Sequence, residues 1–328
     1  MMRFRKGVQH ALGVAALALS GTLMAQEWPI PNKPISIVSA YPAGGSSDVL
    51  GRAIAEKLSS KLKVPVVVEN KVGGGGQIAA AYLRQQPADG HTLWLGDVGP
   101  FATNAHVYPK LNYDMQRDFM AVAKLVNVPV FVVVPASSPY KTLSDLIDGS
   151  KTSPKGLNYG SQGLGLGGHI YGELFKRELG GNFNHLPYRG SIPALQDLMG
   201  GQIDLVHDNA LTSGPFIATG RLRALAVRAN QRMIQFPQVP TMAELGLGRI
   251  NHTLWFGVVV KAGTPAATVE RLSEELVATI RTPEITKKFA DLGLEVSTLG
   301  PNAFNRFLVD ENEKWKLIIR STGIRLDD

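Results

Sequence analysis

The stretch ISIVSAYPAGGSSDVLGRAIAEKLSSKL, residues 35–62, contains one complete unit of an α/β fold. Residues 35–40 are apolar or small and predict a buried strand. Residues 48–62 place apolar side chains at helical spacing and predict an amphipathic helix. The loop between them, residues 41–47, contains the pair Gly44 and Gly45. A strand, a glycine loop and a helix in this order are typical of a sheet whose strands are joined by helices.

The same alternation continues on both sides of a central break. The pattern predicts strands at residues 64–69, 91–96, 128–134, 157–159, 184–186, 203–207, 223–227, 253–260 and 295–298. It predicts helices at residues 77–84, 143–147, 170–179, 192–199, 266–280, 283–292 and 301–319, with Thr142 as an N-cap. We therefore expect parallel sheets with helices on both faces.

Two strongly apolar strands, VPVFVVV at residues 128–134 and TLWFGVVV at 253–260, enclose the middle of the chain. We expect the chain to leave one domain at the first and return at the second. The predicted architecture is two α/β domains joined by two hinge crossings, with a ligand cleft between them. Domain I would comprise residues 26–127 and 253–328, and domain II residues 128–252. Closure around a ligand is the natural motion of such a molecule.

The N-terminus has the anatomy of an export signal. Arg3, Arg5 and Lys6 precede an apolar run at residues 11–19, and Ala25 is a small residue at a plausible cleavage position. We expect residues 1–25 to be a signal peptide and the mature protein to reach the periplasm. Removing these residues lowers the formal net charge from +7 to +4, because 31 Lys and Arg then face 27 Asp and Glu. No basic run remains, so we expect no nucleic-acid partner.

The composition excludes several chemistries. The 328 residues contain no Cys, which removes disulfides, Cys-ligated zinc, iron–sulfur clusters and thiol nucleophiles. The seven His are scattered without a metal-binding spacing. The sequence also lacks a phosphate-binding P-loop, a properly spaced dinucleotide fingerprint and a serine-hydrolase elbow. We therefore expect no metal, no cofactor and no catalytic residue.

Two glycine loops share one physical plan. Residues 41–48 (YPAGGSSD) and 160–169 (GSQGLGLGGH) each follow a predicted strand and precede a predicted helix. Glycines let the backbone approach an anion closely, and a helix N-terminus presents free N–H groups and the positive end of its dipole. One loop from each domain would clamp a carboxylate from two sides. The alternative is that both are simply tight turns between a strand and a helix.

Four polar residues near these loops allow two interpretations each. Asp48 either neutralises the N-terminus of its helix, which we favour, or binds ligand. His169 is either a support for the second loop or a ligand contact. Asp208, with Asn209 next to it, directly follows the predicted strand at residues 203–207 and either hydrogen-bonds ligand or stabilises a turn. Arg189 is either a carboxylate clamp or a brace for the turn in which it lies.

The chain resembles the Bug-type solute-binding proteins, the receptors of tripartite tricarboxylate transporters. The resemblance runs from the signal peptide to the last helix. The segments that carry it are YPAGGSSD (41–48), ENK (69–71), DGHTL (89–93), GSQGLG (160–165), LPYRG (186–190), DLMGGQID (197–204), PQVPTMAE (237–244), WFG (255–257) and AGTP (262–265).

The resemblance implies a type II periplasmic-binding-protein fold whose two glycine loops hold a ligand carboxylate. The candidate ligand-binding residues are Tyr41, Ala43, Gly44, Gly45, Ser46, Ser47, Gly99, Phe101, Ser161, Gln162, Gly163, Leu164, Gly165, His169 and Asp208. Asp208 would face the distal end of the ligand and Phe101 would supply an aromatic wall. The chain departs from the family pattern at residues 97–101 (DVGPF), which replace a Ser/Thr-rich stretch, and at Gly167 and Gly168, where a Ser is common.

The expected function is therefore capture of a small carboxylate by a monomeric periplasmic receptor and its delivery to the membrane subunits of a cognate transporter. Two alternatives remain open. A ligand-loaded receptor of this kind can instead dock on a membrane sensor kinase, and an exported enzyme can use the same cleft. No nucleophile–base pair or carboxylate dyad in the sequence favours the enzyme.

Overall fold

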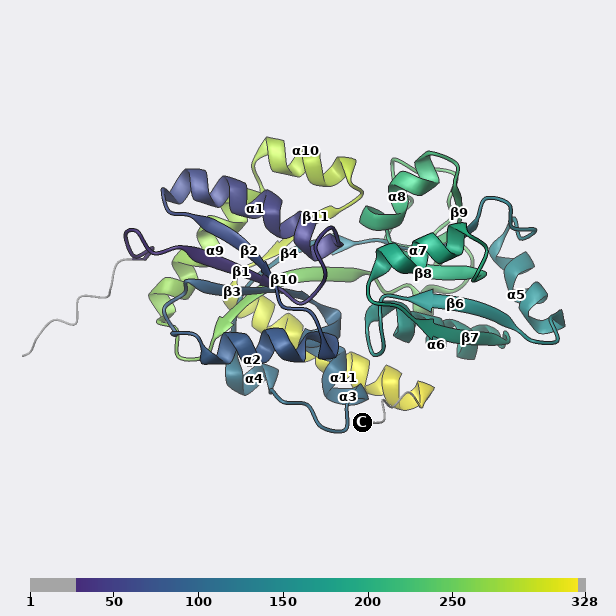
Figure 1. Ribbon diagram of the computed structural model, residues 1–328, viewed down its shortest axis with the longest axis horizontal. Coiled ribbons are helices and arrows are strands. Elements are labelled where there is room, and N and C mark those ends of the chain that lie inside the picture. The colour runs from purple at the N-terminus through teal and green to yellow at the C-terminus, as the bar shows by residue number, and fades with distance from the viewer. Residues whose placement is uncertain (1–27, 324–328) are drawn as a thin grey trace, which may run out of the picture.

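The computed structural model describes residues 28–323, which form an α/β protein with two sheets placed side by side (Figure 1). The predicted signal peptide at residues 1–25 and its cleavage near Ala25 lie outside the described residues. Within the described part of the chain, no helix is both long and apolar enough to cross a membrane.

The first sheet has six strands in the order β11-β4-β10-β3-β1-β2. Their bounds are β1 Ile35–Ser39, β2 Val66–Asn70, β3 Thr92–Asp97, β4 Phe119–Val128, β10 Leu254–Lys261 and β11 Glu295–Leu299. Strands β1, β2 and β3 are parallel, as predicted, but β10 runs antiparallel to both β3 and β4. The prediction of a purely parallel sheet is therefore wrong, because β10 re-enters this domain from the other one and fills the gap between β3 and β4.

Helices cover both faces of the first sheet (Figure 1). They are α1 Ser46–Leu62, α2 Gln77–Gln85, α3 Asn104–Val107, α4 Met115–Asp118, α9 Ala266–Ile280, α10 Pro283–Asp291 and α11 Pro301–Thr322, with short turns at Gly74–Gly76 and Gly99–Thr103. The apolar side of α1 faces the sheet and buries Leu50, Ile54 and Leu58. Burial of such side chains stabilises the fold by roughly 1.5–3 kcal/mol each.

The second sheet has five strands in the order β7-β6-β8-β5-β9. Its strands are β5 Val130–Pro135, β6 Leu157–Ser161, β7 Phe183–Pro187, β8 Leu205–Asn209 and β9 Leu222–Arg228. Its helices are α5 Leu143–Thr152, α6 Gly167–Leu179, α7 Ser191–Met199 and α8 Ala210–Ala218. Strand β5 is antiparallel to both of its neighbours. The predicted N-cap of α5 is confirmed, since the Thr142 side chain accepts a hydrogen bond from the Asp145 N–H in a capping box.

The first crossing between the sheets is a single residue. Strand β4 ends at Val128 in the first sheet, Pro129 follows, and β5 begins at Val130 in the second. The prediction of one strand over residues 128–134 is corrected here. Pro129 has no N–H to give to a sheet ladder, so the apolar run is divided between two sheets at that point.

The second crossing lies between β9 and β10. A segment of the chain, residues 229–253, separates the two strands and includes the short turn Gly248–Ile250. Asn251 closes this segment, because its side chain accepts from the Ala229 N–H at 3.1 Å and donates to the Ala229 carbonyl at 2.9 Å. The two ends of the segment 229–253 are therefore bonded to each other beside the first crossing.

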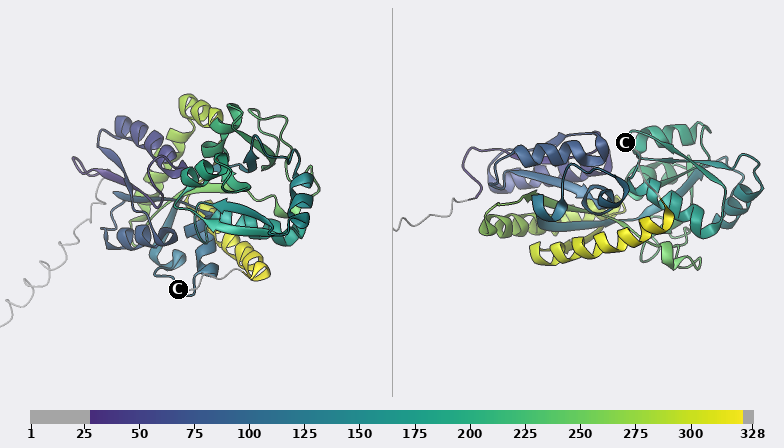
Figure 2. Two further views of the ribbon diagram at one scale, coloured as in Figure 1. Left: turned by 45° about the vertical axis from the view of Figure 1, so that its right-hand side comes forward. Right: turned by 90° about the horizontal axis from the view of Figure 1, so that it is seen from below.

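The C-terminal helix α11 also connects the two halves. It runs along the underside of the first sheet and reaches the second half of the molecule (Figure 2). There Trp315 meets Tyr171 of α6, with 5.9 Å between ring centroids. Ile170 and Tyr171 belong to the same buried apolar cluster as the first sheet, so α6 shares a core with the other domain.

Candidate functional site

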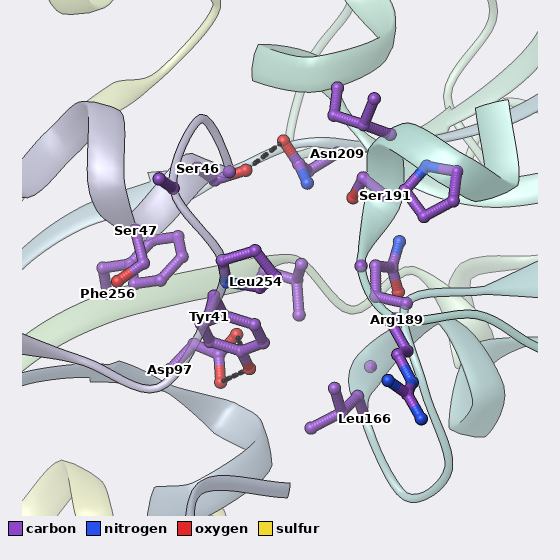
Figure 3. A pocket seen from close by; sticks show the side chains of 18 residues that line it. Tyr41, Ser46, Ser47, Asp97, Leu166, Arg189, Ser191, Asn209, Leu254 and Phe256 are labelled. Atoms are coloured by element: carbon purple, nitrogen blue, oxygen red, sulfur yellow. Dashed lines mark hydrogen bonds between the residues drawn. The ribbon is translucent and has the colours of Figure 1, made fainter. Parts of the chain in front are cut away.

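A cleft of about 90 Å³ lies between the two sheets (Figure 3). Both domains line it at the carboxyl ends of their strands, where open α/β sheets bind ligands. The lining residues are Tyr41, Pro42, Ala43, Gly45, Ser46, Ser47, Asp97, Gln162, Leu166, Gly167, Arg189, Gly190, Ser191, Ile192, Pro193, Asn209, Leu254 and Phe256. The space suits several water molecules or a small solute.

The first glycine loop is held by Asp48, which is buried at the start of α1. Its carboxylate accepts hydrogen bonds from the Gly44 N–H at 3.0 Å, from the Asn70 amide at 3.1 Å and from the Arg52 guanidinium. Burial acts to raise the pKa of Asp48, but these donors outweigh it and lower that pKa below its ordinary value. Asp48 therefore shapes the loop, in agreement with the favoured interpretation, and does not line the cleft.

Hydrogen bonds of the Gln162 and His169 side chains fix the second glycine loop. The Gln162 amide donates to the His207 carbonyl and to Asp208, while its oxygen accepts from the Gly168 N–H. His169 accepts from the Gly165 N–H at 3.1 Å through Nδ1 and stacks on His185 at 4.0 Å. Burial lowers the pKa of His169, which keeps its ring neutral and able to accept this bond.

Three helices begin at the cleft without a side-chain cap. The N-cap residues are Gly45 for α1, Leu166 for α6 and Gly190 for α7, and all three line the cleft. Helices α5, α8 and α10 are capped by Thr142, Asn209 and Thr282, whereas α2, α9 and α11 also lack a side-chain cap but begin away from the cleft. The N-termini at the cleft leave backbone N–H groups and positive dipole ends near it, although the Gly168 N–H of α6 is already bonded to the Gln162 side chain. Their convergence favours an anionic ligand group.

An acid also faces this cleft. Asp97 ends β3, and both of its carboxylate oxygens lie 2.8 Å from the Tyr41 hydroxyl, which donates to them. Oδ1 also accepts from the Gly99 N–H at 3.0 Å. Burial outweighs these donors and raises the pKa of Asp97 to about 6. Burial, and then the charge of Asp97, raise the pKa of Tyr41 well above its ordinary value, so Tyr41 stays a neutral donor.

The opposite wall carries a cation and apolar side chains. Arg189 is exposed at the cleft and forms no hydrogen bond or ion pair with another residue of 28–323. In Figure 3 it projects from the second domain, across the cleft from Tyr41 and Asp97. Leu166, Leu254 and Phe256 supply apolar surface between the two walls. The cleft therefore offers a carboxyl group, a guanidinium cation and apolar surface to one small molecule.

The two domains touch each other across the cleft. The Ser46 hydroxyl donates to the Asn209 side-chain oxygen at 2.8 Å, and Thr103 donates to the Gly165 carbonyl at 3.4 Å. Gly167 is so close to Leu254 that a Cβ built on it would lie 2.8 Å from Leu254 Cδ2. These contacts link the two domains.

The structure brings six of the fifteen candidate residues to the lining. These are Tyr41, Ala43, Gly45, Ser46, Ser47 and Gln162. Gly44 and Gly163 lie in the loops with positive φ values of 81° and 147° but do not line the cleft. Gly165 and His169 bond to each other, and Leu164 is 48% exposed at the tip of the loop.

The other candidates lie behind the lining. Phe101 is buried against Trp94, with ring centroids 4.9 Å apart, so it is a core residue and not a wall of the cleft. Gly99 donates to Asp97. Asp208 is fully buried, where it accepts from Gln162 at 2.9 Å and Ser191 at 2.7 Å. It therefore supports two residues of the lining.

Ser161 has a histidine partner but lies in no position to attack a ligand. Its hydroxyl is 2.7 Å from His185 Nε2, at the distance of a nucleophile and its base. Ser161 is fully buried and does not line the cleft, and burial, together with His169, lowers the pKa of His185 to about 3. This pair braces the second loop. Within residues 28–323, no group of three His, Asp or Glu is arranged to hold a metal ion.

Sequence reasoning missed several lining residues. Asp97 was noted only as a departure from a family pattern, and Arg189 was left undecided. Leu254 and Phe256 are not predicted at the cleft, whereas Asn209 follows Asp208 at a strand end that suits either a ligand hydrogen bond or a turn-stabilising motif. Asp97 and Asn209 each occupy the last position of a strand, which is the one signal that points to them in the sequence.

Comparisons with known proteins agree with this geometry. A family model described as "Tripartite tricarboxylate transporter family receptor" matches residues 50–324. Protein BugT of Bordetella pertussis is 32% identical over 314 residues, which cover 95% of this chain and 96% of that protein.

Two solved structures superpose over nearly their whole length. One, described as R. palustris Rpa4515 with adipate, has a TM-score of 0.87 and 34% identity, and covers 92% of this chain and 100% of that one. The other, described as MatC (Rpa3494) from Rhodopseudomonas palustris with bound malate, has a TM-score of 0.82 and 28% identity. It covers 88% of this chain and 100% of that one. The expected periplasmic-binding-protein fold and the Bug-type resemblance are thereby confirmed.

Proposed function

Because this chain belongs to the family of tripartite tricarboxylate transporter receptors, we propose that it is a periplasmic receptor that captures a small carboxylate in the cleft. The observation that carries this proposal is the convergence of three uncapped helix N-termini, at Gly45, Leu166 and Gly190, on one cleft. Each presents N–H donors to an anion without requiring a buried cation.

The side chains around these N-termini fit a carboxylate as well. The Arg189 guanidinium lines the cleft and forms no hydrogen bond or ion pair with another described residue, so it is available to a carboxylate, whereas the Ser46 and Ser191 hydroxyls already donate to Asn209 and Asp208. The two solved relatives are described with adipate and with malate, which are both small carboxylates. The ligand would enter from solvent and close the cleft further by drawing the two glycine loops together.

Delivery to the membrane subunits of a cognate transporter is the second part of the proposal, and the family assignment supports it. We propose that the receptor works as a monomer, with domain I formed by residues 26–127 and 253–328 and domain II by 128–252. Docking on a sensor kinase is the alternative use of the same loaded state. An enzymatic role has less support, because the described Ser–His pair is buried away from the cleft.

Thermal unfolding in the presence of a carboxylate panel tests the binding function. A ligand present at about 100 times its Kd adds about 2.7 kcal/mol to the free energy of unfolding. Arg189→Gln should raise the Kd of a hit by roughly 10- to 150-fold, since hydrogen bonds to charged groups contribute about 1.5–3 kcal/mol. The control is Arg306→Gln, because Arg306 is an exposed arginine of α11 that lies outside the cleft.

Two results would count against the proposal. Stabilisation by non-carboxylates alone would remove the role of the helix N-termini. Chemical conversion of a bound carboxylate by the purified protein, followed by chromatography, would favour the enzyme.

A further inference from the structure

The carboxylate of Asp97 is out of place in a cleft built for anions. Only 7% of the residue is exposed, and it forms no ion pair within residues 28–323. Its donors are neutral, because the single Tyr41 hydroxyl lies 2.8 Å from both oxygens and the Gly99 N–H bonds to Oδ1. Within residues 28–323, the Tyr41 hydroxyl is the one side-chain donor to Oδ2. It therefore keeps capacity for a further donor.

The cleft has one formal charge on each wall. Among the lining residues, Asp97 on the first domain and Arg189 on the second are the two that carry a charge at neutral pH. Figure 3 places them on opposite sides of the space. The three helix N-termini and Arg189 attract a carboxylate toward the loops, while Asp97 attracts a positive group toward Tyr41.

A plain dicarboxylate meets this arrangement poorly. One of its ends satisfies the N-termini, but an end near Asp97 places two negative groups in a partly desolvated space, where charges interact more strongly than in water. An ammonium group at that end instead completes the hydrogen bonding of Oδ2 and neutralises the buried acid. We propose that Asp97 selects ligands that carry a protonated amino group together with a carboxylate.

This proposal rests on the proposed carboxylate-binding function and narrows it to amino-carboxylates. The environment of Asp97 in the free protein agrees with it. Burial without a cation raises the pKa of Asp97 to about 6. The ionised carboxylate therefore lowers the stability of the free protein, and a bound cation would remove this cost. The other titratable groups that interact with Asp97 are Tyr41, Tyr113 and Tyr171, and burial raises the pKa of each, so they remain neutral.

The experiment compares ligands that differ only at one end. For each linear chain of three to eight carbons, calorimetry measures the Kd of the ω-amino-carboxylate, the dicarboxylate and the plain monocarboxylate, for example 6-aminohexanoate, adipate and hexanoate. The α-amino acids of the same lengths form a second series, because they place the ammonium beside the carboxylate. In at least one series we expect the amino compound to bind about tenfold tighter than its partners.

Substitution then assigns the preference to Asp97. Asp97→Asn keeps the side-chain shape and an acceptor for Tyr41 but removes the charge, so the amino preference should disappear. Asp97→Ser is the second variant in case the first folds poorly, and thermal unfolding reports on both. The matched control is Asp310→Asn on α11, because Asp310 is exposed, lies outside the cleft and changes the net charge equally.

The pH dependence supplies an independent readout. Amino-carboxylates need ionised Asp97 and should bind more weakly at pH 5 than at pH 8. A dicarboxylate benefits from protonated Asp97 and should show the opposite trend. Equal or weaker binding of every amino compound than of its monocarboxylate, while some carboxylate does bind, overturns this inference and leaves the carboxylate function intact. If no carboxylate of any series binds, both are overturned.

Discussion

The Ser46 hydroxyl and the Asn209 side-chain oxygen, 163 residues apart in sequence, form a 2.8 Å hydrogen bond across the cleft. Ser46 is the first residue of α1 in one domain, and Asn209 is the N-cap of α8 in the other. The same Asn209 oxygen accepts from the Leu211 and Thr212 N–H groups at 3.2 Å. Closure of the two domains is thus tied directly to the cap of a helix.

Loss of this bond should shift the molecule toward an open form. Ser46→Ala removes the donor but leaves the cap of α8 intact, so we expect little change in the free energy of unfolding. A net hydrogen bond contributes about 0.5–1.5 kcal/mol, which predicts a two- to tenfold rise in Kd for the ligand. Calorimetry measures the Kd and small-angle scattering the opening. The control is Ser144→Ala at an exposed position, and an unchanged Kd in Ser46→Ala would argue against a role in closure.

A side chain at Gly167 should block closure. Gly167 begins α6, and its missing Cβ would lie 2.8 Å from Leu254 Cδ2 of the other domain. Gly167→Val needs more space than this and should reduce ligand affinity at least tenfold. Gly248→Val is the matched control, because a Cβ there meets no atom within 4 Å. Similar affinities of the two variants would contradict the assignment of Gly167 to the closing surface.

The second glycine loop should loosen when His169 is replaced. His169→Phe keeps an aromatic ring against His185 but leaves the Gly165 N–H without its acceptor. An unsatisfied buried donor costs about 1–3 kcal/mol, so urea unfolding should report a loss of this size. Ligand affinity should fall as well, because the loop loses its shape. His169→Asn, which keeps an acceptor, should recover part of both effects, and full stability of His169→Phe would refute this account.

The buried acid should make stability depend on pH. The pKa of Asp97 is about 6 in the folded protein, against an ordinary value of 3.8. Between these values the folded protein binds more protons than the unfolded chain, so stability from this group falls as pH rises from about 4 to 6. Asp97→Asn removes the dependence. Its stability relative to the parent protein should therefore increase by about 2 kcal/mol between pH 4 and pH 8, as measured by urea unfolding at both values. A constant difference would mean that Asp97 ionises normally.

Local sequence patterns predict a helix or strand correctly when its own residues show the expected apolar periodicity. Helix α9 spans Ala266–Ile280 as its apolar spacing predicts, and β1 differs from its prediction by one residue. Strand β4 at Phe119–Val128, however, is not predicted from the sequence, although it lies inside the first sheet between β11 and β10. Its sequence includes Lys124, which is buried because its ammonium donates to Asn127 and Ser297. A lysine inside a strand hides the apolar pattern that would reveal it.

The candidate site was likewise predictable only where neighbouring residues of one segment form it. Tyr41, Ser46 and Ser47 could be found because one loop after one strand carries them together. Asp97 and Arg189 could not be joined in advance, because they come from different sheets and meet only when the domains face each other. The support role of Asp208 also depends on packing, since Ser191 and Gln162 reach it from other segments.

The single residue Pro129 joins β4 to β5, so the two sheets are connected there by a very short segment. A connection this short would let one sheet rotate relative to the other but leave little room for translation. The Asn251–Ala229 pair fixes the second connection beside it. If the proposed receptor closes around its ligand, the length of that ligand would set the angle between the two sheets. A transporter subunit that docks on the outer surface of the proposed receptor would then respond to the ligand through that angle.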